Sequence, residues 1–417
     1  MGRIEIEGGR RLDGELRVQG SKNSVLPILA ATVLTREPCV IHNCPRLRDV
    51  ESAIHILEHL GCRVHREEGT IQVDASGVDR WDIPLELMRE MRSSVIFLGA
   101  ILSRCGQAAM SYPGGCELGA RPVDLHLEGL RRLGAEIGDQ YGELEGKAPQ
   151  LKGARIQLAF PSVGATENLM LAAACSQGTT VVANSAKEPE IIDLQEMLNG
   201  MGAKIKGAGS GTIVIEGVEK LHGVEYTVLP DRIVAATYLT AAAITGGRVR
   251  LTHVVPEHVE GVTAVLEESG CSIRRGKDTL ELARKGEIRP IRAVQTMPYP
   301  GFPTDAQSIL MSYLTLAKGT SVFVENIFES RYKQVGELLL MGADIRVMGR
   351  MAVVYGVEGL KGARVRCTDL RGGAALAVAA LAAEGTSRID CVEHIDRGYE
   401  DLEGCLTRLG GCARRVE

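Results

Sequence analysis

A short helical pattern that ends in glycine recurs along the chain at nearly constant spacing. Apolar residues at helical spacing precede the glycine, and a small or polar residue and a strand-like run follow it, as in EHLGCRV at 58–64. The glycines that end these patterns are Gly61, Gly134, Gly202, Gly270, Gly342 and Gly410. By subtraction they lie 73, 68, 68, 72 and 68 residues apart. A glycine just after a helix is typical of the C′ position, where the backbone turns left-handed. The spacing therefore predicts six similar units.

A second series of helical patterns precedes the first at a similar interval. These segments are rich in Ala, Leu, Met and Ser and are apolar on nearly every face, which is typical of buried helices. Their predicted ranges are 22–33, 92–102, 165–174, 232–244, 305–316 and 370–383. Most run into a turn and then a strand, so each unit combines two helices with strands.

Six units of this size predict two domains of three units, because one unit alone is too small to bury a stable core. The strand-like run IEIEGG…GELRVQG precedes the first unit and is left over there. We expect it to pair with the C-terminal half. The predicted domains are then 21–229, and 1–20 together with 230–417. A cleft between two similar domains is the default ligand site.

Composition narrows the function classes. The chain has 417 residues, a formal net charge of −5 and only 4% aromatic residues, which disfavours nucleic-acid binding. No apolar stretch is of membrane-spanning length, and the N-terminus MGRIEIEGGRRL carries charges where a signal peptide needs an apolar core. The 11 cysteines form no CxxC pair. We therefore expect no zinc site, no disulfide framework and no membrane insertion, and a cytoplasmic protein.

Charged residues stand at the starts of otherwise apolar helices. Asp305, which follows Thr304, has an ordinary alternative as a helix N-cap. The basic residues are harder to explain structurally, because a cation at a helix N-terminus opposes the helix dipole. They are Lys22, Arg92, Arg121, Arg331, Arg371 and Arg397. Their recurrence predicts convergence on a phosphate or carboxylate. Neither a Walker A motif nor a GxGxxG motif in its strand–helix context occurs, which disfavours nucleotide hydrolysis and dinucleotide binding.

The segment YPGGCELGARPVDL at 112–125 places Cys116 after two glycines and five residues before Arg121. A nearby guanidinium and a helix N-terminus both favour a thiolate. Glycines supply the freedom that a closing loop needs. The alternative is a buried structural cysteine, the usual role of a free thiol. Glycine turns seldom hold core cysteines, so we favour a functional thiol on a mobile loop.

Seven segments together resemble the enolpyruvyl transferase family, and within it the UDP-N-acetylglucosamine 1-carboxyvinyltransferases. They are GSKNSVLPILAA (20–31), PGGCELGARPVDLHL (113–127), PSVGATENLML (161–171), YPGFPTDAQ (299–307), ENIFESR (325–331), TDLRGGAAL (368–376) and HIDRGYE (394–400). The resemblance implies an α/β fold: a two-domain inside-out barrel of six βαβαββ-like repeats, with internal helices and external sheets. It also implies transfer of the enolpyruvyl group of phosphoenolpyruvate to the 3-hydroxyl of UDP-N-acetylglucosamine, with no metal or organic cofactor.

The resemblance also assigns roles. Cys116 would donate a proton and be alkylated by an epoxide phosphonate such as fosfomycin, and Asp305 would contact the sugar hydroxyl as a possible base. Lys22, Arg121 and Arg397 would hold the phosphate of phosphoenolpyruvate, with Arg331 and Arg371 near its carboxylate. The expected sugar-nucleotide contacts are Asn23, Arg92, Arg121, Pro122, Val123, Asp124, Leu125, Ser162, Val163, Gly164 and Ile327, with Phe328 close by.

One departure and two alternatives accompany this interpretation. Some family members carry a diphosphate-binding lysine just before SVG, whereas this chain has Phe160 and Pro161. A shikimate-using relative shares the barrel but needs no catalytic cysteine. A non-catalytic anion-binding protein would be expected to lack at least one of Lys22, Cys116, Asp305 and Arg397, and all four are present.

Overall fold

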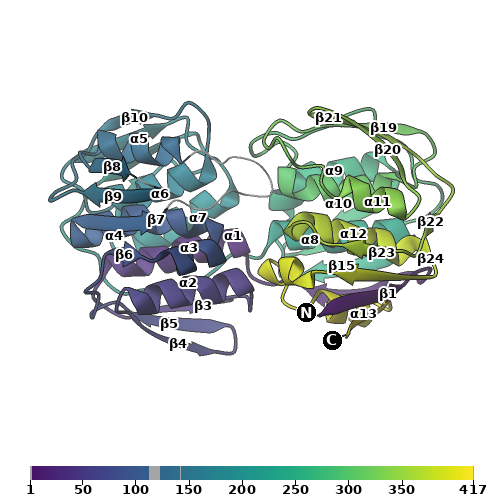
Figure 1. The fold of residues 1–417 in the computed structure, drawn as a ribbon, viewed down its shortest axis with the longest axis horizontal. Coiled ribbons are helices and arrows are strands. Elements are labelled where there is room, and N and C mark those ends of the chain that lie inside the picture. Colours follow the sequence, from purple (N-terminus) through teal and green to yellow (C-terminus); the bar gives the residue numbers. More distant parts are fainter. Residues whose placement is uncertain (1, 112–122, 141, 417) are drawn as a thin grey trace. The chain divides into compact units, whose positions relative to one another are not determined.

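The chain forms a mixed α/β structure that separates into two units (Figure 1). The computed structural model describes residues 2–111, 123–140 and 142–416. The contiguous unit holds the described residues between Gly20 and Leu229, and the split unit holds 2–19 together with 230–416. The chain passes from one unit to the other near 19–20 and near 229–230. Each unit has a hydrophobic core of its own.

The contiguous unit is built from short strands and helices that alternate along the chain. Its strands are β3 (Cys39–His42), β4 (Arg63–Glu67), β5 (Thr70–Asp74), β6 (Asp82–Ile83), β7 (Gln107–Ser111), β8 (Glu136–Gln140), β9 (Glu143–Lys147), β10 (Arg155–Gln157), β11 (Thr179–Ala183), β12 (Lys204–Lys206), β13 (Thr212–Glu216) and β14 (Glu225–Thr227). Its helices, with 3₁₀ helices written η, are α1 (Lys22–Ala31), η1 (Thr32–Leu34), α2 (Arg48–His59), α3 (Leu85–Glu90), η2 (Arg92–Ile96), α4 (Phe97–Cys105), α5 (Asp124–Arg132), α6 (Val163–Ala173) and α7 (Pro189–Gly200).

The split unit has the same kind of alternation and begins with the first two strands of the chain. Its strands are β1 (Arg3–Glu7), β2 (Asp13–Arg17), β15 (Arg248–Thr252), β16 (Cys271–Arg275), β17 (Thr279–Arg284), β18 (Val294–Gln295), β19 (Thr320–Val324), β20 (Asp344–Met348), β21 (Met351–Tyr355), β22 (Leu360–Lys361), β23 (Arg364–Arg366), β24 (Ala383–Glu384), β25 (Thr386–Asp390) and β26 (Cys412–Val416). Its helices are α8 (Arg232–Thr245), η3 (Pro256–Val259), α9 (Glu260–Glu268), α10 (Thr304–Leu314), α11 (Val335–Leu340), α12 (Leu370–Ala382), η4 (Val392–Arg397) and α13 (Leu402–Arg408).

One pairing pattern recurs among the described residues in six four-stranded sheets. In each sheet a parallel pair is followed by two antiparallel pairings, as in the order β14-β3-β5-β4. In the split unit, β2 pairs in parallel with β15, and β1 lies between β25 and β26. The N-terminal strands therefore complete sheets whose other strands come from much later in the chain.

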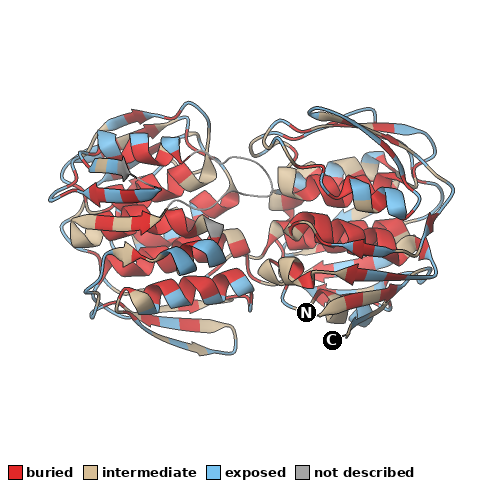
Figure 2. Cartoon of the chain, in the orientation of Figure 1, coloured by how far each residue is buried: buried red, intermediate tan, exposed pale blue. Residues whose placement is uncertain are grey.

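The helices of the apolar series lie against one another inside each unit. In the split unit α8, α10 and α12 contact each other pairwise, and in the contiguous unit α1, α4 and α6 do so. In α8 every residue from Ile233 to Ile244 is buried. Figure 2 shows buried residues concentrated on these helices, while buried and exposed residues alternate along many strands. Helices that are apolar all round are thus covered on all sides.

The six repeat glycines each stand two residues after a helix, beyond its C-cap residue. Their φ angles lie between +90° and +109°, in the left-handed region that favours glycine. This part of the sequence prediction is confirmed. One helix start differs from the prediction, because Arg92 opens the 3₁₀ segment η2 and the α-helix begins only at Phe97. The Ser94 hydroxyl donates to the Met91 carbonyl there, and such bonds compete with regular α-helical turns.

Candidate active site

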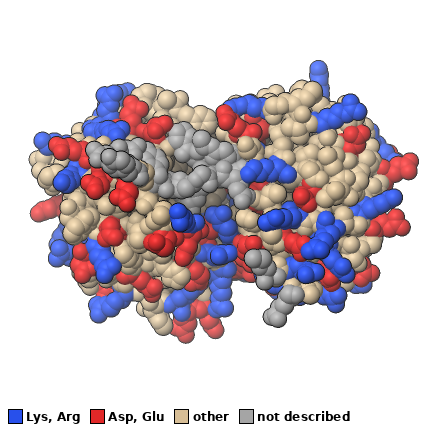
Figure 3. Space-filling model, in the orientation of Figure 1, with Lys and Arg blue, Asp and Glu red and all other residues tan. Residues whose placement is uncertain are grey.

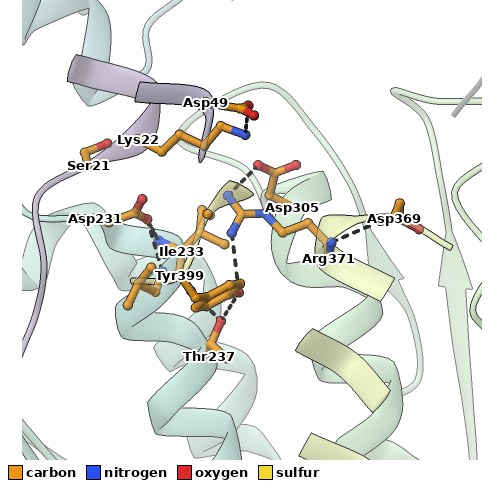
Figure 4. A network of polar contacts seen from close by, with 12 residues as sticks. Ser21, Lys22, Asp49, Asp231, Ile233, Thr237, Asp305, Asp369, Arg371 and Tyr399 are labelled. Atoms are coloured by element: carbon orange, nitrogen blue, oxygen red, sulfur yellow. Dashed lines mark hydrogen bonds and ion pairs between the residues drawn. The ribbon is translucent and has the colours of Figure 1, made fainter. Parts of the chain in front are cut away.

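Asp305 lies in the first turn of α10, held between two arginines. Arg331 Nη2 donates to Asp305 Oδ1 at 2.7 Å. Arg371 Nη2 donates to Asp305 Oδ2 at 3.1 Å (Figure 4). Both arginines are only 3% exposed, whereas the Asp305 side chain is 26% exposed. The ordinary N-cap alternative for Asp305 is wrong, because Pro303 holds the cap position and both carboxylate oxygens face guanidinium groups. Two of the basic residues singled out in the sequence, Arg331 and Arg371, therefore contact one of the protein's own carboxylates.

The backbone of Arg371 is fixed by the start of α12. The Asp369 side chain caps this helix and accepts hydrogen bonds from Arg371 N at 3.0 Å and Gly372 N at 2.9 Å. Burial alone would lower the pKa of Arg371, but the nearby Asp305 and Tyr399 outweigh burial and raise it. The guanidinium is therefore a permanent buried cation that needs negative or polar partners.

The turn that carries Ile327 and Phe328 is organised by Glu325, a fully buried residue that the sequence did not single out. Its Oε1 accepts from Thr296 Oγ1 at 2.9 Å, Ile327 N at 2.8 Å and Phe328 N at 3.0 Å. Its Oε2 accepts from Thr304 Oγ1 at 3.0 Å, at the first residue of α10. The same carboxylate thus ties this turn to the helix that carries Asp305. An acidic residue directly after a strand-like run was the signal available in the sequence.

Phe328 and Arg397 lie in the same unit as Asp305. The Arg331 guanidinium lies 5.5 Å from the centre of the Phe328 ring, a cation–π distance. Arg397 is half-buried and is the last residue of η4. The structure therefore brings Asp305, Arg331, Arg371 and Phe328 into one connected group.

Lys22 is the first residue of α1, directly after the cap residue Ser21. Ser21 caps α1 by accepting from Ser24 N at 3.3 Å. The Lys22 Nζ lies 2.6 Å from Asp49 Oδ2, and both residues are buried. Asp49, in the first turn of α2, was missed because nothing in the sequence links it to Lys22. Asn23 is half-buried beside Lys22 in the chain.

The predicted sugar-nucleotide segments of the contiguous unit are joined by His126 and Asn168. Asn168 Nδ2 lies 2.9 Å from His126 Nδ1 on α5 and donates to Val95 O at 2.7 Å. Asn168 Oδ1 accepts from Gly99 N at 2.6 Å. A Cβ atom on Gly164 would lie 3.1 Å from His126 Cε1, so α6 starts directly against this ring.

The residues predicted to contact the sugar nucleotide lie at the two helix starts that this network joins. Val123 is buried at the N-cap position of α5, Asp124 is exposed and Leu125 is half-buried. Ser162 caps α6 by accepting from Ala165 N at 3.3 Å, and Val163 opens that helix. Cys116, Arg121 and Pro122 and the side chain of Arg92 lie outside the described part of the structure.

Other features of the described residues bear on cofactors and surface. Within those residues no group of three or more His, Cys, Asp or Glu side chains could hold a metal ion. Of the helices in the described ranges, none is long and apolar enough to span a membrane. Lys and Arg side chains are interspersed with Asp and Glu over the face drawn in Figure 3.

Comparison with known proteins gives consistent matches over the whole chain. The pattern of the EPSP synthase (3-phosphoshikimate 1-carboxyvinyltransferase) family matches residues 6–406. A UDP-N-acetylglucosamine 1-carboxyvinyltransferase 2 from Caldanaerobacter subterraneus subsp. tengcongensis is 52% identical over 416 residues, covering 100% of both chains. A UDP-N-acetylglucosamine 1-carboxyvinyltransferase 1 from Symbiobacterium thermophilum is 51% identical over 422 residues, covering 99% of this chain and 95% of that one.

Solved structures agree with these matches. The enolpyruvyl transferase NikO from Streptomyces tendae has a TM-score of 0.89 at 28% identity and covers 100% of this chain and 99% of its own. An EPSP synthase from Acinetobacter baumannii has a TM-score of 0.76 at 19% identity, with 100% of both chains covered, and shows a shared fold.

Proposed function

This chain belongs to the UDP-N-acetylglucosamine 1-carboxyvinyltransferase family, and from that premise we propose how it acts. It transfers the enolpyruvyl group of phosphoenolpyruvate to the 3-hydroxyl of UDP-N-acetylglucosamine and releases phosphate, the first committed step of peptidoglycan precursor synthesis. The observation that carries the proposal is Asp305 held between two buried arginines at a helix start, in a chain about half identical to relatives of that name over their full length. The compartment proposed is the cytoplasm, in keeping with ten free cysteines among the described residues.

Arg331 and Arg371 are proposed to bind the carboxylate of phosphoenolpyruvate. Each has a buried Nε that finds no hydrogen-bond partner among the residues described. A buried donor without a partner costs free energy, and an anionic ligand that reaches it removes that cost. Asp305 is proposed to bind the sugar 3-hydroxyl and accept its proton. The Asp305 side chain is partly exposed, so a substrate hydroxyl has access to its carboxylate. Arg331 and Arg371 already balance the negative charge of that carboxylate.

The remaining roles are proposed from the family resemblance. Lys22, Arg121 and Arg397 surround the phosphate, because negative charge grows on that group as the C–O bond breaks. Cys116 supplies the proton to the vinyl carbon and forms the covalent adduct. The sugar nucleotide is proposed to contact Asn23, Arg92, Arg121–Leu125, Ser162–Gly164, Ile327 and Phe328. In this proposal no metal or organic cofactor takes part.

The finer architecture belongs to the same proposal. Each unit is proposed to be one domain of three βαβαββ-like repeats, an inside-out barrel with its sheets outside its helices. The recurring sheet order and the mutual contacts of α8, α10 and α12 support this.

One assay tests the activity. The protein is mixed with phosphoenolpyruvate and UDP-N-acetylglucosamine, and phosphate release is measured, with shikimate 3-phosphate as the control acceptor. We expect release with the sugar nucleotide alone. The Cys116→Ser variant should keep its fold and lose covalent labelling by an epoxide phosphonate. Release with shikimate 3-phosphate instead would overturn the acceptor, and full labelling of the variant would overturn the role of Cys116.

A further inference from the structure

Arg371 has a second anchor besides Asp305, and it lies deeper in the protein. Arg371 Nη1 donates to the Tyr399 hydroxyl at 3.4 Å, and the guanidinium carbon lies 5.8 Å from the centre of the Tyr399 ring. Tyr399 is 1% exposed. Figure 4 shows Arg371 between Asp305 on one side and Tyr399 on the other. Because Tyr399 is buried, it acts on substrate only through Arg371.

The direction of the hydrogen bonds around Tyr399 follows from counting donors. The Tyr399 hydroxyl lies 2.8 Å from Thr237 Oγ1, which lies 2.8 Å from Ile233 O. A carbonyl only accepts, so the Thr237 hydroxyl donates its one hydrogen to the Ile233 carbonyl. Tyr399 must then donate to Thr237, and its oxygen is left to accept from Arg371. The order Arg371→Tyr399→Thr237→Ile233 thus has one donor for each acceptor.

This directed series sets the rotation of the guanidinium. One terminal nitrogen is committed to Asp305 and the other to Tyr399, so the group cannot turn both terminal nitrogens onto the carboxylate. We propose that Tyr399, held by Thr237, is a positioning residue that orients Arg371 for the carboxylate of phosphoenolpyruvate. The inference rests on the proposed role of Arg371 in binding that carboxylate.

Without the Tyr399 hydroxyl, the buried Arg371 Nη1 loses its hydrogen-bond acceptor. The guanidinium then regains a hydrogen bond if it rotates so that both terminal nitrogens face Asp305. The substrate carboxylate would then meet a competing bidentate pair. The expected defect is larger for phosphoenolpyruvate than for the sugar nucleotide. Asp305 serves both substrates in the proposed function, but most of the proposed sugar-nucleotide contacts, segments 123–125 and 162–164 among them, belong to the contiguous unit.

The test measures steady-state kinetics for Tyr399→Phe, with the dissociation constant of phosphoenolpyruvate from calorimetry in the absence of acceptor. We expect KM and Kd for phosphoenolpyruvate to rise about ten- to hundredfold, a range set by one hydrogen bond to a charged group. KM for UDP-N-acetylglucosamine should rise by a smaller factor than KM for phosphoenolpyruvate. Thr237→Ser should behave like the wild type, because it keeps the hydroxyl, and Thr237→Val should shift in the direction of Tyr399→Phe.

Tyr313→Phe is the matched control. The Tyr313 hydroxyl lies 2.8 Å from another side-chain hydroxyl, Ser269 Oγ, and Tyr313 is buried in the same unit as Tyr399. It should leave both KM values unchanged. Equal effects of Tyr399→Phe and Tyr313→Phe, or an unchanged phosphoenolpyruvate KM and Kd in Tyr399→Phe, would overturn the positioning role. A wild type that binds phosphoenolpyruvate without turning it over would instead count against the proposed function, and the Kd comparison would still test Tyr399.

Discussion

His126 is a histidine whose surroundings keep it neutral. It is buried on α5, and burial lowers its pKa to about 4. Its Nδ1 accepts from the Asn168 amide, so the ring hydrogen resides on Nε2. A neutral ring is compatible with this network, whereas a protonated Nδ1 would place two donors against each other.

The pH dependence of stability should therefore carry a signature of His126. The unfolded histidine has a pKa near 6.5 and the folded one about 4, so the unfolded state binds the extra proton first as pH falls. The stabilisation is complete above about pH 6.5 and decreases toward pH 4. Between pH 7 and pH 4.5 we expect the wild type to lose about 2 to 3 kcal/mol of unfolding free energy that His126→Gln does not lose. Urea unfolding at both pH values measures this difference.

The comparison with the variant is needed because buried carboxyl groups in the same unit act in the opposite direction. Burial raises the pKa of Asp193 to about 6 and also raises that of Glu167. These groups favour the folded state as pH falls. Parallel pH curves for the wild type and His126→Gln would show that the histidine is not buried in its neutral form.

At this scale the sequence identified the charged residues better than their partners. The sequence places Asp305, Arg331 and Arg371 at helix starts, and the structure joins their side chains. Arg331, however, lies in a turn four residues before α11 begins. Asp49, Glu325 and Tyr399 were not, because each acts through a residue far away in the chain. Helix starts can be recognised from the local sequence. Which side chains from other parts of the chain pack against a given helix start cannot.

At the scale of elements, helix contacts in the core depend on the absence of side chains. Gly99 on α4 lies against α6, and a Cβ there would come within 2.3 Å of the Asn168 carbonyl oxygen. The same glycine donates its N–H to Asn168 Oδ1. Backbone packed on backbone at this distance leaves no room for a methyl group.

We expect Gly99→Ala to destabilise the contiguous unit by about 2 kcal/mol, because α4 and α6 must separate. Urea unfolding measures the loss, and the KM for UDP-N-acetylglucosamine should rise because the start of α6 moves with the helix. Gly336→Ala in α11 is the control, since nothing lies within 4 Å of its added Cβ. That change should be neutral or stabilising by up to about 1 kcal/mol. Equal stability of the two variants would contradict the close contact.

Element types were well predicted where the signal is local. Four of the apolar helices begin within one residue of their predicted starts, at Lys22, Arg232, Thr304 and Leu370. Helix ends and the 3₁₀ turn at Arg92 were less accessible, because hydrogen bonds such as that from Ser94 to Met91 decide them. The register of β1 and β2 was not predictable, since their partner strands lie hundreds of residues away in the chain.

At the scale of the whole molecule, the split unit depends on both ends of the chain. Ile4 on β1 pairs with Ile389 on β25 and with Arg415 on β26. Asp13 on β2 pairs with Arg248 on β15. β1 lies between two partners, so its loss would leave two strands without their neighbour.

Deletion of residues 2–17 should therefore unfold the split unit selectively. Hydrogen–deuterium exchange measures this, with loss of amide protection expected in β15, β25 and β26. Protection in β5 and β13 should remain, because the contiguous unit contains all the strands of its sheets. Unchanged protection in β25 would show that β1 is dispensable, and equal loss in both units would show that they unfold together.

The pairing of the first strands with the last ones also fixes an order of events during synthesis. The ribosome makes β1 and β2 first. Their partner strands, β25 with Ile389 and β15 with Arg248, emerge only after the contiguous unit is complete. That unit closes on itself when β14 pairs with β3. It is thus free to fold on the ribosome. β2 waits only until β15 emerges, whereas β1 keeps open hydrogen-bonding edges until translation is nearly finished. Translation that stops early would release a folded contiguous unit whose N-terminal strand β1 is unpaired. Such a strand can pair with other chains, so chaperones would need to bind this form.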